Sequence, residues 1–194
     1  MQLVEQFLVA LAAAWDRPAR PTLRILGSTA LFLRTDYARG TRDSDVLSTA
    51  ELEPPIQERL LEIAGPSSKL ARRFHLHLQI LPNGIPFLPR APRWHALRLQ
   101  GQPDTIGFEV LDVTDVVVSK LKRFHANDRS DIEAMVVRGL VSHEELVARF
   151  RSAVDAFLLD ARAADLPRYV RNLHEVERDL FVVEETEIEL PEWI

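Results

Sequence analysis

The chain of 194 residues contains no cysteine. That absence excludes disulfide bonds, cysteine-based zinc sites and thiol nucleophiles, and it favours a reducing compartment, the cytoplasm. No uninterrupted apolar run reaches the roughly 18–20 residues that a helix needs to cross a bilayer, so no membrane association is expected. Basic residues are outnumbered by acidic ones, 24 against 29. The resulting net charge of −5 argues against a broad basic surface that coats nucleic acid.

Lysine is also scarce. Of the 24 basic residues only Lys69, Lys120 and Lys122 are lysines, and the other 21 are arginines. Such an excess of arginine over lysine reflects genome composition and carries little functional information. The hydrophobic share of 46% is ordinary for a folded domain and sufficient for a core, which excludes a disordered or low-complexity chain.

Hydrophobic periodicity predicts a mixed α/β half followed by a helical half. The sequence predicts strands over 22–26, 44–48, 74–80, 97–99 and 106–111. It predicts helices over 2–15, 30–34, 54–64, 116–124, 128–138, 142–163 and 166–181. We therefore expect an α/β (α+β) fold with a small mixed sheet in residues 1–140. Residues 141–194 are expected to form a C-terminal helical extension with an acidic tail.

One passage carries chemistry: Gly27-Ser28 at the end of a predicted strand, then Asp43-Ser44-Asp45 on the next. Alternation along a strand predicts that Asp43 and Asp45 share one face. Two neighbouring carboxylates repel each other unless a cation lies between them, and Mg²⁺ takes oxygen ligands of this kind. A Gly-Ser turn at a helix N-terminus offers N–H groups to a phosphate. A metal beside a phosphate cradle is the minimum apparatus for phosphoryl or nucleotidyl transfer.

This arrangement resembles the nucleotidyltransferase (polymerase-beta-like) superfamily, and most closely its small bacterial abortive-infection branch. Members of that branch tend to carry Arg-x-Thr-x-Asp-x-Asp, and the chain has Arg39-Gly-Thr41-Arg42-Asp43-Ser44-Asp45. A helix with Lys120, followed by Asp128-x-x-Asp131, is a second point of likeness. The resemblance covers about residues 22–138 and implies a nucleotidyltransferase-like α/β core.

The resemblance implies transfer of a nucleotidyl group from a nucleoside triphosphate such as ATP to an acceptor hydroxyl. Asp43 and Asp45 would be catalytic and would bind Mg²⁺ or Mn²⁺. The implied nucleotide-binding residues are Gly27, Ser28, Thr41, Arg42, Lys120 and Asp131. A role in phage defence or as the toxin of a toxin–antitoxin pair is also implied, with a tRNA or a protein as acceptor and an antitoxin as partner.

Active members of the superfamily have a third carboxylate on a later strand. The strand expected here carries His75, His77 and Gln79 instead, and Glu109 is the best substitute candidate because it lies within a predicted strand. The incomplete triad leaves an alternative open, a catalytically inactive binding or partner module. Structural roles also remain open: helix capping for Ser28, Asp128 and Asp131, and a surface position for Lys120, His75 and His77.

Overall fold

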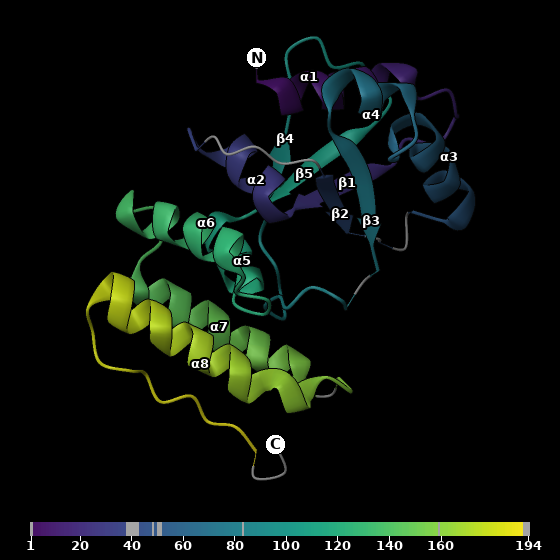
Figure 1. Ribbon diagram of the computed structural model, residues 1–194. Helices are drawn as coiled ribbons and strands as arrows, with labels where there is room; N and C mark the ends of the chain where they lie inside the picture. The colour runs from purple at the N-terminus through teal and green to yellow at the C-terminus, as the bar shows by residue number, and fades with distance from the viewer. Residues whose placement is uncertain are drawn as a thin grey trace. The chain divides into compact units, whose positions relative to one another are not determined.

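The computed structural model describes residues 2–37, 43–47, 49, 52–82, 84–158 and 160–191 (Figure 1). The chain divides into two compact units. The first comprises Met1–Ile85 and Trp94–Asp112, and the second comprises Pro86–Arg93 and Val113–Ile194. The boundary expected near residue 140 lies inside the second unit.

A five-stranded mixed sheet forms the centre of the first unit, which confirms the expected fold class. Its strands are β1 (Thr22–Leu26), β2 (Asp43–Leu47), β3 (His77–Leu81), β4 (Trp94–Leu97) and β5 (Gly107–Leu111), in the order β3-β2-β1-β5-β4. The pairs β1–β5 and β2–β3 are parallel, whereas β1–β2 and β4–β5 are antiparallel. The order makes β3 and β4 the edge strands and places β2 directly between β1 and β3.

The two faces of this sheet differ because side chains alternate along each strand. One face supplies the core, with Leu23, Ile25, Val46, Leu78, Phe108 and Val110 at most 3% exposed. Helices α1 (Leu3–Ala14), α3 (Pro54–Ala64) and α4 (Lys69–Phe74) contact one another beside the sheet (Figure 1). The opposite face carries Arg24, Asp45, Gln79 and Glu109, so the polar chemistry of the sheet is concentrated there.

Helix α4 corrects the prediction of a strand that begins at Phe74. The Oγ of Ser68 accepts a hydrogen bond of 2.9 Å from the Ala71 amide and starts the helix. Phe74 ends the helix and packs edge-on against Phe7, with ring centroids 6.0 Å apart. His75 then takes a left-handed conformation with φ of 52°, so it lies outside β3 and apart from His77 and Gln79.

The second unit is helical. It contains α5 (Val113–Lys120), α6 (Ala126–Val137), α7 (His143–Phe157), α8 (Leu166–Val176) and a π-helical turn over Glu177–Phe181. In Figure 1, α7 and α8 run side by side, and Phe157 on α7 contacts Tyr169 on α8. Phe87, from the segment 86–93, packs edge-on against Phe150, Phe157 and Tyr169.

The long helix predicted over 142–163 ends earlier, at Phe157. Asp160 accepts a hydrogen bond of 2.9 Å from the amide of Arg162 and also binds its guanidinium, which stabilises a turn in place of helix. No helix within the described ranges is long and apolar enough to cross a membrane.

Candidate functional site

The site is built around the corner between β1 and α2 (Gly27–Arg34). The helix begins directly at Gly27, three residues earlier than expected. Gly27 has φ of +67°, and a methyl group on its Cα would come within 2.6 Å of Oδ2 of Asp45. Only glycine meets both requirements, because it tolerates a left-handed φ and leaves room for the carboxylate. The Asp45 carboxylate therefore lies against the first residue of α2.

Strand pairing explains this contact. β1 and β2 are antiparallel neighbours, and Leu26 at the end of β1 pairs with Asp45. The chain thus returns from α2 into β2 so that Asp45 faces the point where α2 begins. The first N–H groups of a helix have no acceptor inside the helix and carry a partial positive charge. A carboxylate and a helix N-terminus consequently meet at one corner of the sheet.

The other residues of the acidic motif are only partly described. Thr41 and Arg42 lie outside the described residues, and of Asp43 the backbone in β2 is described. Ser44 is fully buried on the core face, and its Oγ has no hydrogen-bond partner within the described part of the chain. The hydroxyl of Ser44 therefore points away from the face that carries Asp45.

On the outer side of β2, β3 supplies the adjacent residues of the same face. Asp43 pairs with His77, and Asp45 pairs with Gln79. His77 is half-buried and Gln79 is exposed. The residue that pairs with Asp45 on β3 therefore carries an amide and not a carboxylate.

Glu109, the candidate for that third carboxylate, lies elsewhere on this face. It pairs with Arg24 across β1 and β5, and its Oε2 accepts a 2.8 Å hydrogen bond from Arg24 Nε. Neighbouring strands are about 4.8 Å apart and residues rise about 3.3 Å along a strand. Glu109 lies two strands from β2, level with Leu47 and two residues along from Asp45, so the backbones of Glu109 and Asp45 are about 12 Å apart. The Arg24 guanidinium also lies over Trp94, 5.5 Å from the ring centroid. The structure thus brings Glu109 to Arg24, a partner that the sequence analysis missed and that only the register reveals.

Lys120 and Asp131 belong to the second unit. The Lys120 ammonium lies 3.0 Å from Oδ1 of Asp128 and 2.8 Å from Oδ2 of Asp131, and all three side chains are at most 5% exposed. Burial corrects the alternative of a surface lysine. Asp128 does cap α6, but as the third residue of a helix that begins at Ala126: it accepts a hydrogen bond from the amide of His125, the N-cap residue. Asp131 lies further inside the helix and binds Lys120.

A second buried ion pair stabilises the same unit. Arg149 donates to both carboxylate oxygens of Asp115, each at 2.6 Å, and Asp115 is completely buried. Asp115 also accepts a 2.8 Å hydrogen bond from the Arg93 amide and so joins the segment 86–93 to α5 and α7. These contacts account for Asp115 as a structural residue.

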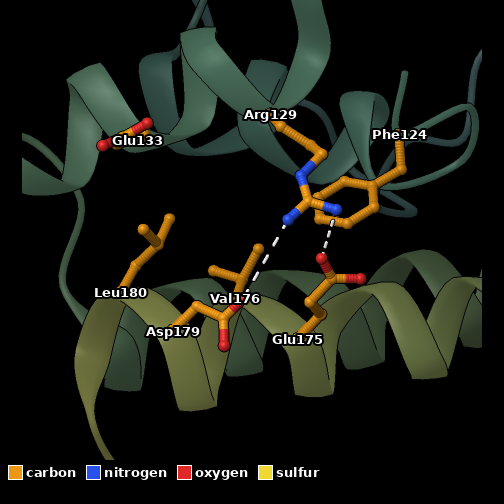
Figure 2. A pocket seen from close by; sticks show the side chains of 7 residues that line it. All are labelled: Phe124, Arg129, Glu133, Glu175, Val176, Asp179 and Leu180. Atoms are coloured by element: carbon orange, nitrogen blue, oxygen red, sulfur yellow. Dashed lines mark ion pairs between the residues drawn. The ribbon is translucent and has the colours of Figure 1, made fainter. Parts of the chain in front are cut away.

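A small pocket of about 130 Å³ lies between α6 and the end of α8 (Figure 2). In Figure 2, Arg129 reaches across it to the carboxylates of Glu175 and Asp179, and its guanidinium lies over the Phe124 ring. The remaining lining residues are Glu133, Val176 and Leu180. This pocket is not predictable from local sequence patterns, because its lining comes from two parts of the chain that are far apart, residues 124–133 and 175–180.

The β1–α2 corner supplies some of the donor atoms that a cation site needs, but not a complete set among the described side chains. Among the residues whose side chains the structure describes, no group of three or more histidine or acidic side chains is placed to hold a metal ion. The Asp45 carboxylate occupies the space beside Gly27 that any side chain at position 27 would fill. This carboxylate suits a divalent cation that takes oxygen ligands.

Comparison with curated proteins and with solved structures finds no significant match. A family model described as nucleotidyltransferase of unknown function (DUF6036) matches residues 3–179. That range includes the Gly27 corner, all five strands and most of the second unit. The chain therefore belongs to this family of nucleotidyltransferases of unknown function.

Proposed function

We propose that the chain is a metal-dependent nucleotidyltransferase that uses a nucleoside triphosphate. The observation that carries this proposal is the contact between the Asp45 carboxylate and Gly27 at the start of α2. A helix N-terminus binds phosphate oxygens, and a carboxylate binds a divalent cation. This corner therefore offers one binding group for each component of a metal–triphosphate complex. Membership of the family supports the same reaction.

The chemistry would be an in-line displacement at the α-phosphorus. The acceptor hydroxyl oxygen forms a bond to phosphorus, the bond to the pyrophosphate oxygen breaks, and the hydroxyl proton passes to a base. Asp43 and Asp45 would hold Mg²⁺ or Mn²⁺, which neutralises phosphate charge when bound. Gly27 and Ser28 would bind phosphate oxygens through backbone N–H groups, and Arg42 and Thr41 would add contacts from the connecting segment.

The Lys120 cluster and the Glu109–Arg24 pair take supporting roles in this proposal. Because the Lys120 ammonium is already engaged by Asp128 and Asp131, we assign these residues to the stability of the second unit. Glu109 would act through Arg24, whose guanidinium it orients on the face that carries Asp45. The negative charge of the phosphates would then be neutralised mainly by groups at the β1–α2 corner.

The biological setting proposed is phage defence or a toxin–antitoxin pair in the cytoplasm, with a tRNA or a protein as the acceptor. This part rests on the resemblance to the abortive-infection branch.

A catalytically inactive binding module is the second candidate. The observation that favours it is Gln79, a neutral side chain beside Asp45 where a third carboxylate would strengthen the binding of cations. Such a module would still bind a metal–triphosphate complex but would leave the triphosphate intact.

Labelled triphosphates distinguish these two functions. The protein is incubated with Mg²⁺ or Mn²⁺, a pool of tRNA or of protein, and a triphosphate labelled at the α- or γ-phosphorus. Transfer of the α-label alone to macromolecules supports nucleotidyl transfer, whereas transfer of the γ-label would indicate a kinase. Asp45→Asn should abolish transfer, while Glu58→Gln, which changes an exposed carboxylate on α3, should leave it unchanged. Binding without any transfer of label would favour the inactive module.

A further inference from the structure

We infer that His77 and Gln79 on β3 complete the cation site of Asp43 and Asp45, and that His77 makes this site prefer Mn²⁺ to Mg²⁺. The inference deepens the proposed function and rests on it.

The first argument is the register of β2 and β3. These strands are parallel neighbours, with Asp43 beside His77 and Asp45 beside Gln79. Paired residues on neighbouring strands project from the same face of a sheet at a backbone spacing of about 4.8 Å. Ligands on a common cation lie within a few Å of one another, so β3 is the strand from which further donors reach the acidic pair.

The second argument is which residues of this region are accessible. Leu76 and Leu78 are buried in the core, whereas His77 is half-buried and Gln79 is exposed. His75 precedes the strand in a left-handed conformation and is outside the register, so the two histidines are not equivalent. Of the two, His77 alone is paired with a residue of the acidic motif.

The third argument is that other polar groups on this face are engaged elsewhere. Leu47, two residues beyond Asp45, pairs with Arg24, and Arg24 is bound to Glu109. On the other side of Asp45, β1 contributes Leu26, which offers no donor. Additional donors for a cation at Asp45 therefore come from β3 rather than from β1 or β5.

The donor set determines which ion is preferred. Mg²⁺ requires an octahedral shell that is almost entirely oxygen, and it is reluctant to exchange water for nitrogen. Mn²⁺ accepts carboxylate oxygen as Mg²⁺ does, but it also belongs to the first-row series of divalent metals that bind sites with nitrogen donors, in which its affinity is the lowest. The proposed donor set therefore suits Mn²⁺ better than Mg²⁺: it consists of two carboxylates, one amide oxygen and one imidazole nitrogen.

Binding of the ions alone tests this inference without any enzymatic activity. Wild-type protein is titrated with Mn²⁺ by electron paramagnetic resonance at about pH 8, because metal binding requires deprotonated ligands, and Mg²⁺ is measured by competition. We expect Mn²⁺ to bind more tightly than Mg²⁺. His77→Ala should weaken Mn²⁺ binding by about tenfold and leave Mg²⁺ binding nearly unchanged, which removes the preference. Gln79→Glu should tighten the binding of both ions.

The matched control is His75→Asn, because asparagine tolerates the left-handed conformation at that position. This variant should bind both ions as the wild type does. A spectroscopic measurement on the wild type adds a test that needs no variant: electron spin echo modulation of bound Mn²⁺ should show coupling to a histidine nitrogen.

The outcomes separate this inference from the proposed function. If Asp45→Asn abolishes Mn²⁺ binding but His77→Ala keeps the preference, or if the echo shows no nitrogen coupling, this inference is overturned and the proposed function stands. If the wild type binds neither ion, even with a non-hydrolysable triphosphate, the proposed function fails as well.

Discussion

At the scale of single residues, Gly27 is the position where backbone conformation and the candidate site meet. Its φ of +67° and the 2.6 Å approach that a methyl group would make to Asp45 are separate constraints. The first concerns the local backbone, and the second concerns a residue 18 positions further along the chain. A substitution here therefore tests the tertiary contact as well as the turn.

We expect Gly27→Ala to destabilise the protein through both constraints. The left-handed conformation costs about 1 to 2 kcal/mol for alanine, and the clash with Asp45 adds about 1 to 3 kcal/mol. Denaturant unfolding measures the sum. Gly101→Ala is the matched control, because Gly101 has φ of +76° but open space around it, so only the first cost applies. Adding Asp45→Ala to Gly27→Ala should recover the second cost. No recovery would mean that the two residues are not in contact.

Substitution of Glu109 distinguishes a structural ion pair with Arg24 from a role as a metal ligand. Its carboxylate is 31% exposed and bound to Arg24, so Glu109→Gln should lower the free energy of unfolding by no more than about 1 kcal/mol. Because Glu109 lies two strands away from β2, we expect Mn²⁺ affinity to stay within about twofold of the wild type. A loss of Mn²⁺ binding comparable to that of Asp45→Asn would instead identify Glu109 as a ligand.

At the scale of elements, the buried ion cluster joins α5 to α6. Lys120, the last residue of α5, compensates two carboxylates of α6, Asp128 and Asp131. Removing one partner from a buried cluster leaves charge without compensation, and this costs about 3 to 5 kcal/mol. We therefore expect Lys120→Met to destabilise the second unit by that amount in thermal or denaturant unfolding. Lys69→Met, which changes an exposed lysine of α4, should alter stability by less than about 0.5 kcal/mol.

The C-terminal segment 182–191 is held against the helices by a buried carboxylate. Glu177 accepts hydrogen bonds from the Thr186 amide at 3.0 Å and from His143 Nε2 at 2.8 Å. Burial by itself would raise the pKa of the Glu177 carboxyl, but these hydrogen bonds outweigh it and hold the pKa below the ordinary value of 4.5. The charged form of Glu177 is therefore the form that retains the segment.

A pKa that is lower in the folded protein gives stability that is present above the ordinary carboxyl pKa and is lost as the pH falls through the folded value. We expect hydrogen exchange of the Thr186 amide to be protected near neutral pH. It should lose protection, relative to the α7 amides, as the pH falls below the ordinary carboxyl value of 4.5 and through the lower pKa of the folded state. Glu177→Gln should lose most of this protection at neutral pH and show no such transition. Protection that is independent of pH in the wild type would contradict the role given to Glu177.

At the scale of the whole molecule, binding of a metal–triphosphate complex should stabilise the folded chain. A ligand at about 100 times its dissociation constant adds about 2.7 kcal/mol when it binds the folded state only. We expect Mn²⁺ with a non-hydrolysable triphosphate to raise the melting temperature accordingly. The double variant Asp43→Asn, Asp45→Asn should fold but lose this gain, whereas Glu58→Gln should keep it. Equal shifts in the double variant and the wild type would place the metal elsewhere.

Much of the fold was predictable because local rules are strong in this chain. Helix α3 begins at Pro54 as expected, since proline suits a first helical turn, and β1 covers the predicted residues Thr22–Leu26. The error at α4 has a tertiary cause. Phe74 fits the alternating pattern of a strand, but its ring packs against Phe7 of α1, a residue that is distant in sequence. Tertiary packing thus places Phe74 in α4, although the alternating pattern of the sequence extends the strand to this residue.

The sequence by itself determined the order of the strands and of the α-helices other than α4, and it singled out Gly27, Asp43 and Asp45. Gly27 is demanded by a left-handed backbone, and the motif of Asp43 and Asp45 lies on the strand that follows. Only the tertiary structure decided which residues lie beside the motif: Gln79 next to Asp45, and Glu109 bound to Arg24. The physical reason is range. Backbone conformation and alternation depend on a few neighbouring residues, whereas the register between strands is set by the packing of segments that are dozens of residues apart.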